Sequence, residues 1–203
     1  MISAFAASAI AQQTAWPDGV YYTVDEFKAK TPRARPVIGQ IERTENDIKW
    51  GGGSGYFFYS DDDEIKDRHI NRDVMFVVFK SKVYLNTRII ERGKGYAECL
   101  TQGTFLVMEF NTTDATAANT AGVLFGAIGA AIAVAATPVE FTLYVHSLRT
   151  GNSRFLTREY LEARMADHPD LLKQWNDDVL GYDVPSKYLM IKYINLLNER
   201  LDK

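Results

Sequence analysis

A candidate ligand-binding surface centres on one predicted strand, which covers residues 83–90. Because side chains alternate along a strand, Tyr84, Asn86 and Arg88 share one of its faces. Together with Tyr56 or Tyr59 of an earlier strand, they could form a polar-aromatic surface that binds a small molecule. The alternative interpretation is a strand face that is only exposed to solvent. These side chains are therefore the candidate ligand face of the protein.

The other reactive side chains do not form a recognisable catalytic or metal site. His69, His146 and His168 are far apart in the sequence and lack the H-E-x-x-H spacing of a helical zinc site. We expect His146 to be a surface or half-buried strand residue and His168 to cap a helix. The single cysteine, Cys99, is expected to be a small buried residue on a strand. The sequence thus predicts no catalytic residue, no metal and no cofactor, and it favours a non-enzymatic protein without excluding an enzyme.

Two loops have compositions that could bind ions, but neither has the required context. The glycine-rich residues 51–55 are not followed by G-K-[ST] or by a helix that could hold a phosphate. The acidic residues 61–64 lack the alternating order of a calcium loop. We interpret both as solvated loops.

An uncharged segment at residues 115–139 differs from the rest of the chain. Glycine and alanine recur four residues apart in two neighbouring rows: Gly122, Gly126 and Ala130, and beside them Gly129 and Ala133. On a helix, each row lies on one face, and small side chains there let a second helix approach closely. This glycine-zipper pattern predicts helix packing, within the protein or against another molecule.

Three interpretations of this segment remain open: a membrane-embedded helix, a helix or bent helical hairpin packed within the fold, and a peripheral insertion that contacts a membrane or a second copy. The segment is long enough to span a bilayer, but it is only modestly hydrophobic and has no Lys/Arg cluster at its ends. A single crossing would also divide what looks like one sheet. Packing within the fold is the favoured interpretation.

The N-terminus has the composition of a signal peptide remnant. Residues 1–11 are small and apolar, and Ala9 and Ala11 match an A-x-A cleavage site. The basic start of a signal peptide is missing, so a frayed tail is the alternative. We expect export to the periplasm or cell envelope and a single α+β domain over residues 12–203.

Composition and patterning support a folded α+β protein. The chain has 203 residues and a net charge of −3, and it lacks a basic stripe, so nucleic acid is not expected as a partner. A helix is predicted from Thr23, with Glu26 completing a capping box, and two amphipathic helices end the chain, the first interrupted at Pro169 and the last beginning near Ser186. Strands are predicted at residues 37–43, 56–59, 74–79, 83–90, 104–110, 141–148 and 153–156, with a turn at 81–82. The expected fold is a small, mostly antiparallel sheet with the Gly/Ala-rich helix as an insertion.

Several short motifs along the chain together suggest a relationship to a known family. They are Gly19-Val20-Tyr21, Glu26-Phe27 and Pro32, then residues 82–86, 92–96, the Gly/Ala-rich segment, 144–151 and 170–172. This pattern resembles an uncharacterised family of exported Bacteroidota proteins, a domain of unknown function with a G-[IV]-Y…EF…P start. The resemblance implies a signal peptide, an envelope location and a fold built on a small sheet, and it implies no catalytic residues.

Two function classes follow from these observations. The favoured one is an exported, envelope-associated, non-enzymatic protein whose apolar helix serves for packing, self-association or membrane contact. Its partner is then a second copy or a membrane. The alternative is a soluble periplasmic domain that binds or converts a small molecule on the polar-aromatic sheet face.

Overall fold

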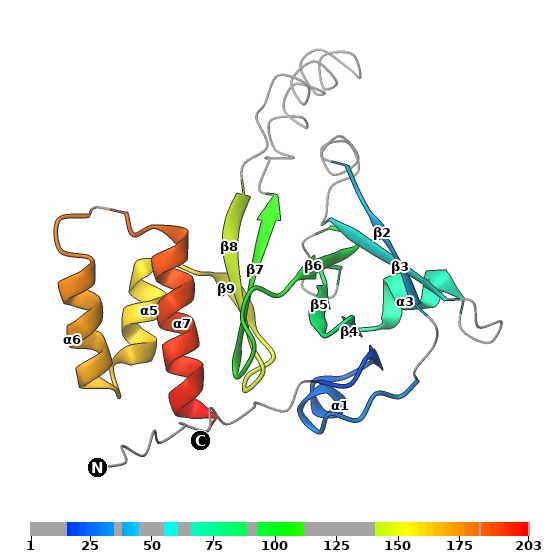
Figure 1. Ribbon diagram of the computed structural model, residues 1–203, viewed down its shortest axis with the longest axis horizontal. Coiled ribbons are helices and arrows are strands. Elements are labelled where there is room, and N and C mark those ends of the chain that lie inside the picture. Colours follow the sequence, from blue (N-terminus) through cyan, green and yellow to red (C-terminus); the bar gives the residue numbers. More distant parts are fainter. Residues whose placement is uncertain are drawn as a thin grey trace, which may run out of the picture.

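The computed structural model describes residues 16–34, 38–44, 55–60, 66–88, 93–111, 141–182 and 184–202. The described residues form strands and helices that are labelled as in Figure 1. The strands are β1 (Gly19–Tyr21), β2 (Ile38–Glu42), β3 (Tyr56–Ser60), β4 (Phe76–Phe79), β5 (Lys82–Asn86), β6 (Tyr96–Glu98), β7 (Phe105–Asn111), β8 (Phe141–Ser147) and β9 (Ser153–Phe155). The helices are α1 (Val24–Lys28), α3 (Asp67–Asp73), α5 (Arg158–Met165), α6 (Pro169–Asp178) and α7 (Lys187–Leu201).

Six strands form an antiparallel sheet in the order β1-β4-β5-β6-β3-β2. The sheet curls, so that β2 and β3 pass across the face of β4 and β5 (Figure 1). A hydrogen bond from Gln40 Nε2 on β2 to the Tyr84 hydroxyl on β5, at 3.3 Å, joins strands that are not neighbours in the sheet. The curl therefore encloses space on the inner face of this sheet.

The other three strands form a second antiparallel sheet in the order β7-β8-β9, and α5, α6 and α7 cover one of its faces (Figure 1). Side chains at alternate positions of β7 and β8, among them Val107 and Val145, enter a core with Trp175 and Tyr193 of the helices. Asn198 fixes α7 to β7, because its side-chain amide accepts from Phe105 N at 2.8 Å and donates to Phe105 O at 2.9 Å. The helices and this sheet thus form one closed layer.

The two sheets pack face to face around a central core. Leu106, Met108 and Tyr144 of the three-stranded sheet lie in one buried cluster with Phe76 and Leu85 of the six-stranded sheet. Side chains of one strand face alternate sides, so each sheet contributes one face to this core. The order of layers is helices, three-stranded sheet, six-stranded sheet, and then the curled strands on the far side (Figure 1).

The α+β prediction is confirmed, as are the predicted helix starts. Thr23 Oγ1 accepts from Glu26 N at 3.1 Å and the Glu26 carboxylate accepts from Thr23 N at 3.3 Å, which is the expected capping box. Thr157 and Ser186 cap α5 and α7 through their hydroxyl groups. Val83 and Leu85 lie on the opposite face of β5 from Tyr84, as the alternation predicts.

The structure differs from the expected arrangement in three respects. There are two sheets instead of one, because β7 and β8 pair with each other and not with β6 along their length. Pro169 stands in the first turn of α6, so the interrupted helix is two helices and three C-terminal helices follow the strands. Helix α3 and strand β6 were not predicted, because elements of seven and three residues are too short to show a period.

Several predicted features lie outside the described residues: the signal peptide remnant at residues 1–11, residues 51–54, residues 61–64, and the apolar segment 115–139 with Gly122, Gly126, Gly129, Ala130 and Ala133. The strands that flank this segment are described. β7 and β8 pair over their whole length, and Asn111 lies opposite Phe141. The described residues on either side of this segment, Asn111 and Phe141, therefore lie next to each other at one end of the sheet. Within the described ranges, no helix is long and apolar enough to cross a membrane.

Candidate functional site

The inner face of the curled sheet has an apolar end and a polar end. Phe58 of β3, Val77 of β4 and Tyr96 of β6 fill the apolar end with Ile70 of α3. The polar end receives the side chains of Tyr84 and its neighbours, which lie on the same face by strand alternation. Helix α3 closes only the apolar end, so the polar end stays open.

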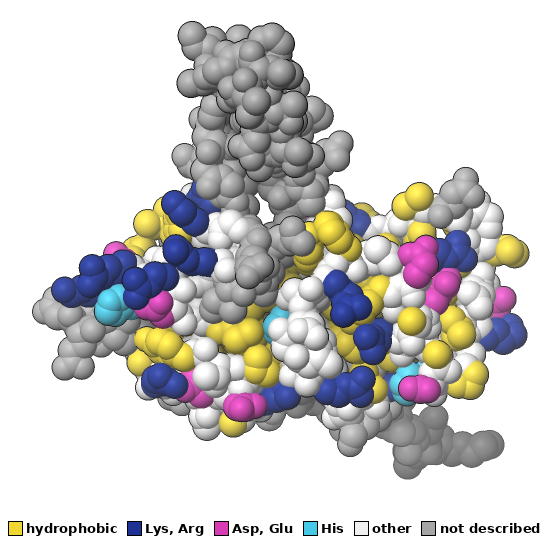
Figure 2. Space-filling view, turned by 180° about the vertical axis from the view of Figure 1, so that it is seen from behind, with side chains coloured by type: hydrophobic (Ala, Val, Ile, Leu, Met, Phe, Trp, Pro, Cys, Tyr) yellow, Lys and Arg dark blue, Asp and Glu magenta, His cyan; other side chains and the backbone are white. Residues whose placement is uncertain are grey.

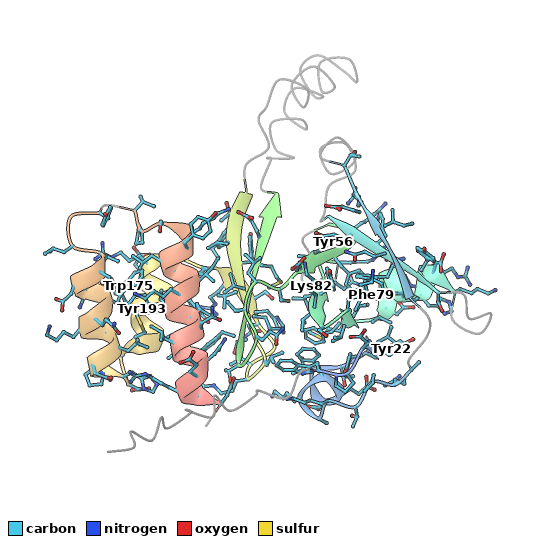
Figure 3. All side chains as sticks on the ribbon, viewed as in Figure 1. Tyr22, Tyr56, Phe79, Lys82, Trp175 and Tyr193 are labelled. Carbon is cyan, nitrogen blue, oxygen red and sulfur yellow. The ribbon has the colours of Figure 1, made fainter. Side chains whose placement is uncertain are left out.

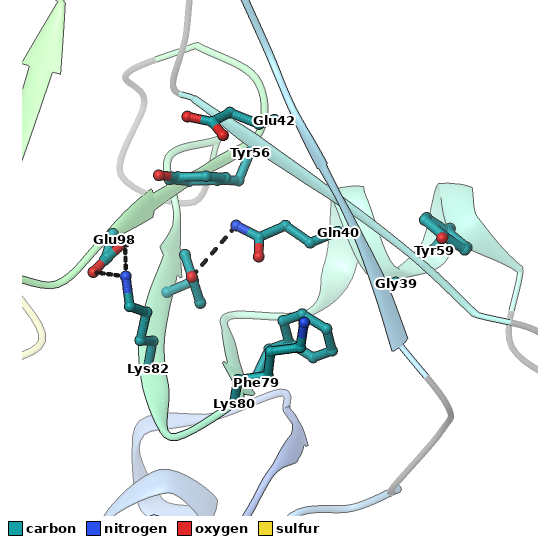
Figure 4. Close-up of a pocket in the computed structure, with 10 residues that line it drawn as sticks. Gly39, Gln40, Glu42, Tyr56, Tyr59, Phe79, Lys80, Lys82 and Glu98 are labelled. Atoms are coloured by element: carbon teal, nitrogen blue, oxygen red, sulfur yellow. Dashed lines mark hydrogen bonds and ion pairs between the residues drawn. The ribbon is translucent and has the colours of Figure 1, made fainter.

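A cavity of about 550 Å³ lies at the polar end. Figure 4 shows its lining, which comes from five strands and one turn: Gly39, Gln40, Glu42, Tyr56, Tyr59, Phe79, Lys80, Lys82, Tyr84 and Glu98. Volumes of about 300–1,000 Å³ are typical of pockets that enclose small ligands. The lining combines aromatic rings with a few polar groups, which is the usual character of such pockets.

Two polar interactions join side chains that line the cavity (Figure 4). Lys82 Nζ lies 2.8 Å from Glu98 Oε1 and 3.1 Å from Glu98 Oε2, so the ion pair joins β5 to β6. The amide of Gln40 donates to the Tyr84 hydroxyl. That hydroxyl keeps its own proton for donation to a ligand.

Aromatic side chains form one wall of the cavity. The Tyr56 and Tyr84 rings meet edge to face, with centroids 5.2 Å apart and planes 73° apart. Phe58 packs against Tyr84 in the same way at 5.0 Å. Figure 3 shows Tyr56, Lys82 and Phe79 gathered in this part of the molecule, far from Trp175 and Tyr193 in the helical layer. The wall holds the Tyr84 hydroxyl in place at the cavity.

The electrostatic state of these groups follows from burial and from the two carboxylates. Burial raises the pKa of the Tyr84 phenol, and the charge of Glu98 raises it further. Burial and the charges of Glu98 and Glu42 raise the pKa of Tyr56 in the same way. The hydrogen bond to Glu98 raises the pKa of Lys82. At neutral pH both phenols are therefore protonated and Lys82 is cationic, so the cavity offers donors and acceptors together.

A tight turn between β4 and β5 sets the position of the lysines. Lys80 and Ser81 both have positive φ, 52° and 62°, as the hairpin turns that match the strand twist require. Asp18 holds this turn, because its carboxylate accepts from Lys80 N at 3.0 Å and from Ser81 N at 3.1 Å. The predicted turn at residues 81–82 is thus wrong by one residue, and Lys82 is the first residue of β5.

The candidate ligand face predicted from the sequence is brought together only in part. Tyr84 and Tyr56 lie side by side at the cavity, while Tyr59 sits on the opposite face of β3, over Gly39 at the rim. Asn86 is buried at the apolar end, where its amide donates to Val74 O at 2.9 Å. Arg88 follows β5 and is exposed, with its backbone N–H bonded to Asn86 Oδ1.

Five polar residues of the cavity were not predicted from the sequence as site residues: Gln40, Glu42, Lys80, Lys82 and Glu98. Lys82 could have been found, because it stands two residues before Tyr84 and shares its strand face. Gln40 and Glu42 alternate on β2 in the same way, but their approach to Tyr84 depends on the curl of the sheet. Glu98 depends on β6, which is three residues long.

The histidines do not take part in this cavity. His146 is fully buried between the sheets, which corrects the expected surface or half-buried position. His168 is the N-cap residue of α6, as expected, and its backbone oxygen accepts from Leu172 N at 2.9 Å, but its side chain makes no capping hydrogen bond. Cys99 is buried, as predicted. Across the described part of the chain, no three His, Cys, Asp or Glu side chains are grouped as metal ligands.

The charged side chains of the surface occur in several separate groups, and many Lys and Arg have Asp or Glu beside them (Figure 2). Ion pairs such as Arg200–Asp170 at 2.6 Å and Lys173–Asp177 at 2.7 Å account for part of this pattern. Exposed pairs of this kind contribute little to stability.

Comparison with known proteins identifies one related family. The model of a family of unknown function (DUF6563) matches residues 19–201, from the start of β1 to the end of α7. A search of curated proteins and a search of solved structures each found no match.

Proposed function

The chain belongs to the family of unknown function DUF6563, and from this premise we propose that it binds a small polar molecule in the cavity of the curled sheet. The observation that carries the proposal is the convergence of the Lys82–Glu98 ion pair, the Tyr84–Gln40 hydrogen bond and the Tyr56 ring on one cavity of about 550 Å³. A sheet face that served only for packing would be filled with apolar side chains, as the other end of this face is.

The charges of the lining restrict the class of ligand. Lys80 and Lys82 are balanced by Glu42 and Glu98, so the cavity has no net formal charge. A ligand with a net charge would lose hydration without meeting a net opposite charge in the lining. We therefore expect a neutral or zwitterionic molecule that carries hydroxyl or amide groups and an apolar face for the Tyr56 ring.

Binding without catalysis fits the chemistry of the lining. The described residues around the cavity include no histidine, cysteine or serine, the side chains that most often act as bases or nucleophiles. The phenols are held in their protonated form, in which they donate hydrogen bonds but do not attack a substrate. The protein is thus a binding domain in this proposal.

Thermal unfolding in the presence of ligand panels tests the proposal. Hexoses, amino acids and inorganic or organic anions are added at equal concentration, and a stabilising ligand raises the unfolding temperature by mass action. We expect a rise with a neutral or zwitterionic compound and none with phosphate or citrate. Glu98→Gln should move the preference toward anions, while Glu199→Gln, an exposed residue of α7, should not. Stabilisation by anions alone in the wild type would contradict the proposal.

A second candidate function concerns residues 112–140 and the cell envelope. We propose that the protein is exported in a Bacteroidota cell and that the apolar segment 115–139 contacts a membrane or a second copy of the chain. The supporting observation is the pairing of Asn111 with Phe141. A single crossing would place these residues on opposite sides of a hydrocarbon core of about 30 Å, so any insertion must return to the same side.

Fractionation of the native host cells tests this second proposal. The membrane pellet is washed with alkaline carbonate, which removes proteins that are not embedded. Retention in the washed pellet supports export and insertion of the segment. Recovery in the soluble periplasmic fraction supports export and contradicts insertion, and recovery in the cytoplasm contradicts export. Replacing Gly122 and Gly126 by leucine should reduce retention or assembly, because large side chains prevent close helix approach.

A further inference from the structure

The connection between α6 and α7, together with the first turn of α7, exposes large apolar side chains. Leu180 and Val184 are each 82% exposed, Tyr188 is 75% exposed and Tyr182 is 62% exposed. These four residues are called the apolar loop patch below. Apolar side chains that are grouped and exposed to this degree indicate an interaction surface, whereas single exposed residues do not.

Buried residues and two hydrogen bonds anchor the chain beside the patch. Val179, which precedes the patch, and Pro185, which lies between Val184 and Tyr188, are buried. Tyr182 N donates to Val179 O at 3.0 Å, and Tyr182 O accepts from the Arg158 guanidinium at 3.4 Å. The side chain of Tyr182 is therefore exposed while its backbone is hydrogen-bonded.

The patch lies at the end of the molecule where residues 112–140 leave the sheet. Lys187, the first residue of α7, pairs with Glu109 of β7 at 2.9 Å, and Glu109 is two residues from the end of that strand. Figure 1 shows the α6–α7 connection (orange) on the same upper side as the free ends of β7 and β8. Hydrophobic side chains project at this corner in Figure 2, at the upper right. The patch and the ends of β7 and β8 at Asn111 and Phe141 thus lie on the same side of the molecule.

The charges next to the patch are already paired. Besides the Lys187–Glu109 pair, Lys192 lies 2.9 Å from Asp178 and Lys173 lies 2.7 Å from Asp177. The described surroundings of the patch therefore hold few unpaired cations that would attract an anionic surface. Tyrosines beside leucine and valine are the composition of segments that rest in the headgroup region of a bilayer.

We propose that the apolar loop patch docks this end of the protein onto the surface of a lipid bilayer, mainly by apolar contact and not by charge. The inference rests on the proposed membrane contact of residues 115–139 and assigns the described residues that share it. A bilayer is the occupant that would accommodate both the exposed patch and the apolar sequence that joins Asn111 to Phe141 on the same side of the molecule. The patch would then orient the sheet axis relative to the membrane.

Flotation of the full chain with phosphatidylcholine vesicles tests the inference. We expect the protein to float with vesicles equally at about 0.05 M and about 0.5 M NaCl, because the stronger salt screens charges beyond a few ångströms but leaves apolar contact intact. The double variant Leu180→Ser/Val184→Ser should lower the vesicle-bound ratio at least about tenfold. The matched control is Leu201→Ser, since Leu201 is also an exposed leucine but lies at the other end of α7, about 20 Å away. It should float as the wild type does.

A variant in which Asn-Gly replaces residues 112–140 separates this inference from the proposal on which it rests. One outcome is that the variant without residues 112–140 no longer floats while Leu180→Ser/Val184→Ser floats as the wild type does. That outcome supports the membrane contact of residues 115–139 and overturns the docking role of the patch. No flotation of the wild type overturns both. Binding only to anionic vesicles at low salt, or a change of the patch variant in molar mass by light scattering without a change in flotation, also overturns the inference.

Discussion

The two sheets of this protein each pack one face against the other sheet, but their outer faces are covered differently. The three-stranded sheet is covered by α5, α6 and α7, and its outer face contributes Val107, Val145 and other apolar side chains to a closed core. The six-stranded sheet is covered by its own curled edge, and α3 closes only one end. The uncovered end carries the cavity with Lys82, Glu98 and Tyr84.

This difference shows how one fold can separate stability from binding. A face covered by helices must be continuously apolar, because polar groups buried there would lack partners. A face covered by a curled strand can remain open at one end, and its polar groups then meet solvent or a ligand. Substitutions in the helical layer should therefore affect stability, while substitutions at the cavity should affect binding.

The largest expected effect is on the free energy of unfolding, and it appears when one aromatic residue of each region is replaced by alanine. Trp175→Ala should lower the free energy of unfolding by about 3–5 kcal/mol, because Trp175 is fully buried and packs on Tyr193 at 5.1 Å. Tyr56→Ala should cost only about 1 kcal/mol, since its ring borders the cavity and is half-buried. Urea unfolding followed by circular dichroism measures both. Equal losses would show that the cavity region is as tightly packed as the helical layer.

His146 allows a test of the core that both sheets share. It is buried, its Nδ1 lies 2.8 Å from Ser153 Oγ, and its Nε2 has no hydrogen-bond partner among the described residues. Burial lowers its pKa from 6.5 to about 4. As the pH falls, this histidine binds a proton in the unfolded chain before it does so in the folded protein. The contribution of His146 to the free energy of unfolding is therefore complete above pH 6.5 and is lost as the pH falls toward 4, by about 3 kcal/mol in total.

The measurement is urea unfolding of the wild type and of His146→Leu at pH 7.5 and pH 4.5. The variant should lose about 2–3 kcal/mol less than the wild type on acidification, because it lacks the buried group that must become charged. An identical loss in both proteins would show that His146 is accessible to solvent or already protonated in the folded state.

Features of the fold that neighbouring residues determine could be predicted from the sequence, whereas features that depend on residues far apart in the sequence could not. Local signals were sufficient for the capping box of Thr23 and Glu26, for the cap at Ser186 and for the alternation of Val83 and Tyr84. The helical layer is built from such signals, so its elements were predicted, apart from the separation of α5 and α6 at Pro169.

The cavity depends on longer-range information. The contact of Gln40 with Tyr84 joins residues 44 positions apart, and nothing in either strand alone determines that the sheet curls. The predicted turn also placed Lys82 outside the strand, so the prediction omitted it. Asn86 and Arg88 were included by alternation, but Asn86 lies at the buried apolar end and Arg88 lies beyond the end of β5.

The smallest effect on stability, and the sharpest on binding, is expected from Tyr84→Phe. The ring keeps its contacts with Tyr56 and Phe58, so the loss of one hydroxyl at a 3.3 Å hydrogen bond should cost about 1 kcal/mol or less. The affinity for the neutral or zwitterionic ligand selected by the thermal panel should fall about tenfold, because the donor at the cavity is gone.

Tyr21→Phe is the matched control for this variant, since Tyr21 is a buried tyrosine on the opposite face of the same sheet and its hydroxyl donates to Pro17 O at 2.5 Å. We expect it to lose a similar amount of stability but no affinity in isothermal titration. If both variants bind the ligand equally well, the Tyr84 hydroxyl takes no part in recognition, and the open end of the curled sheet differs from the closed helical layer in packing alone.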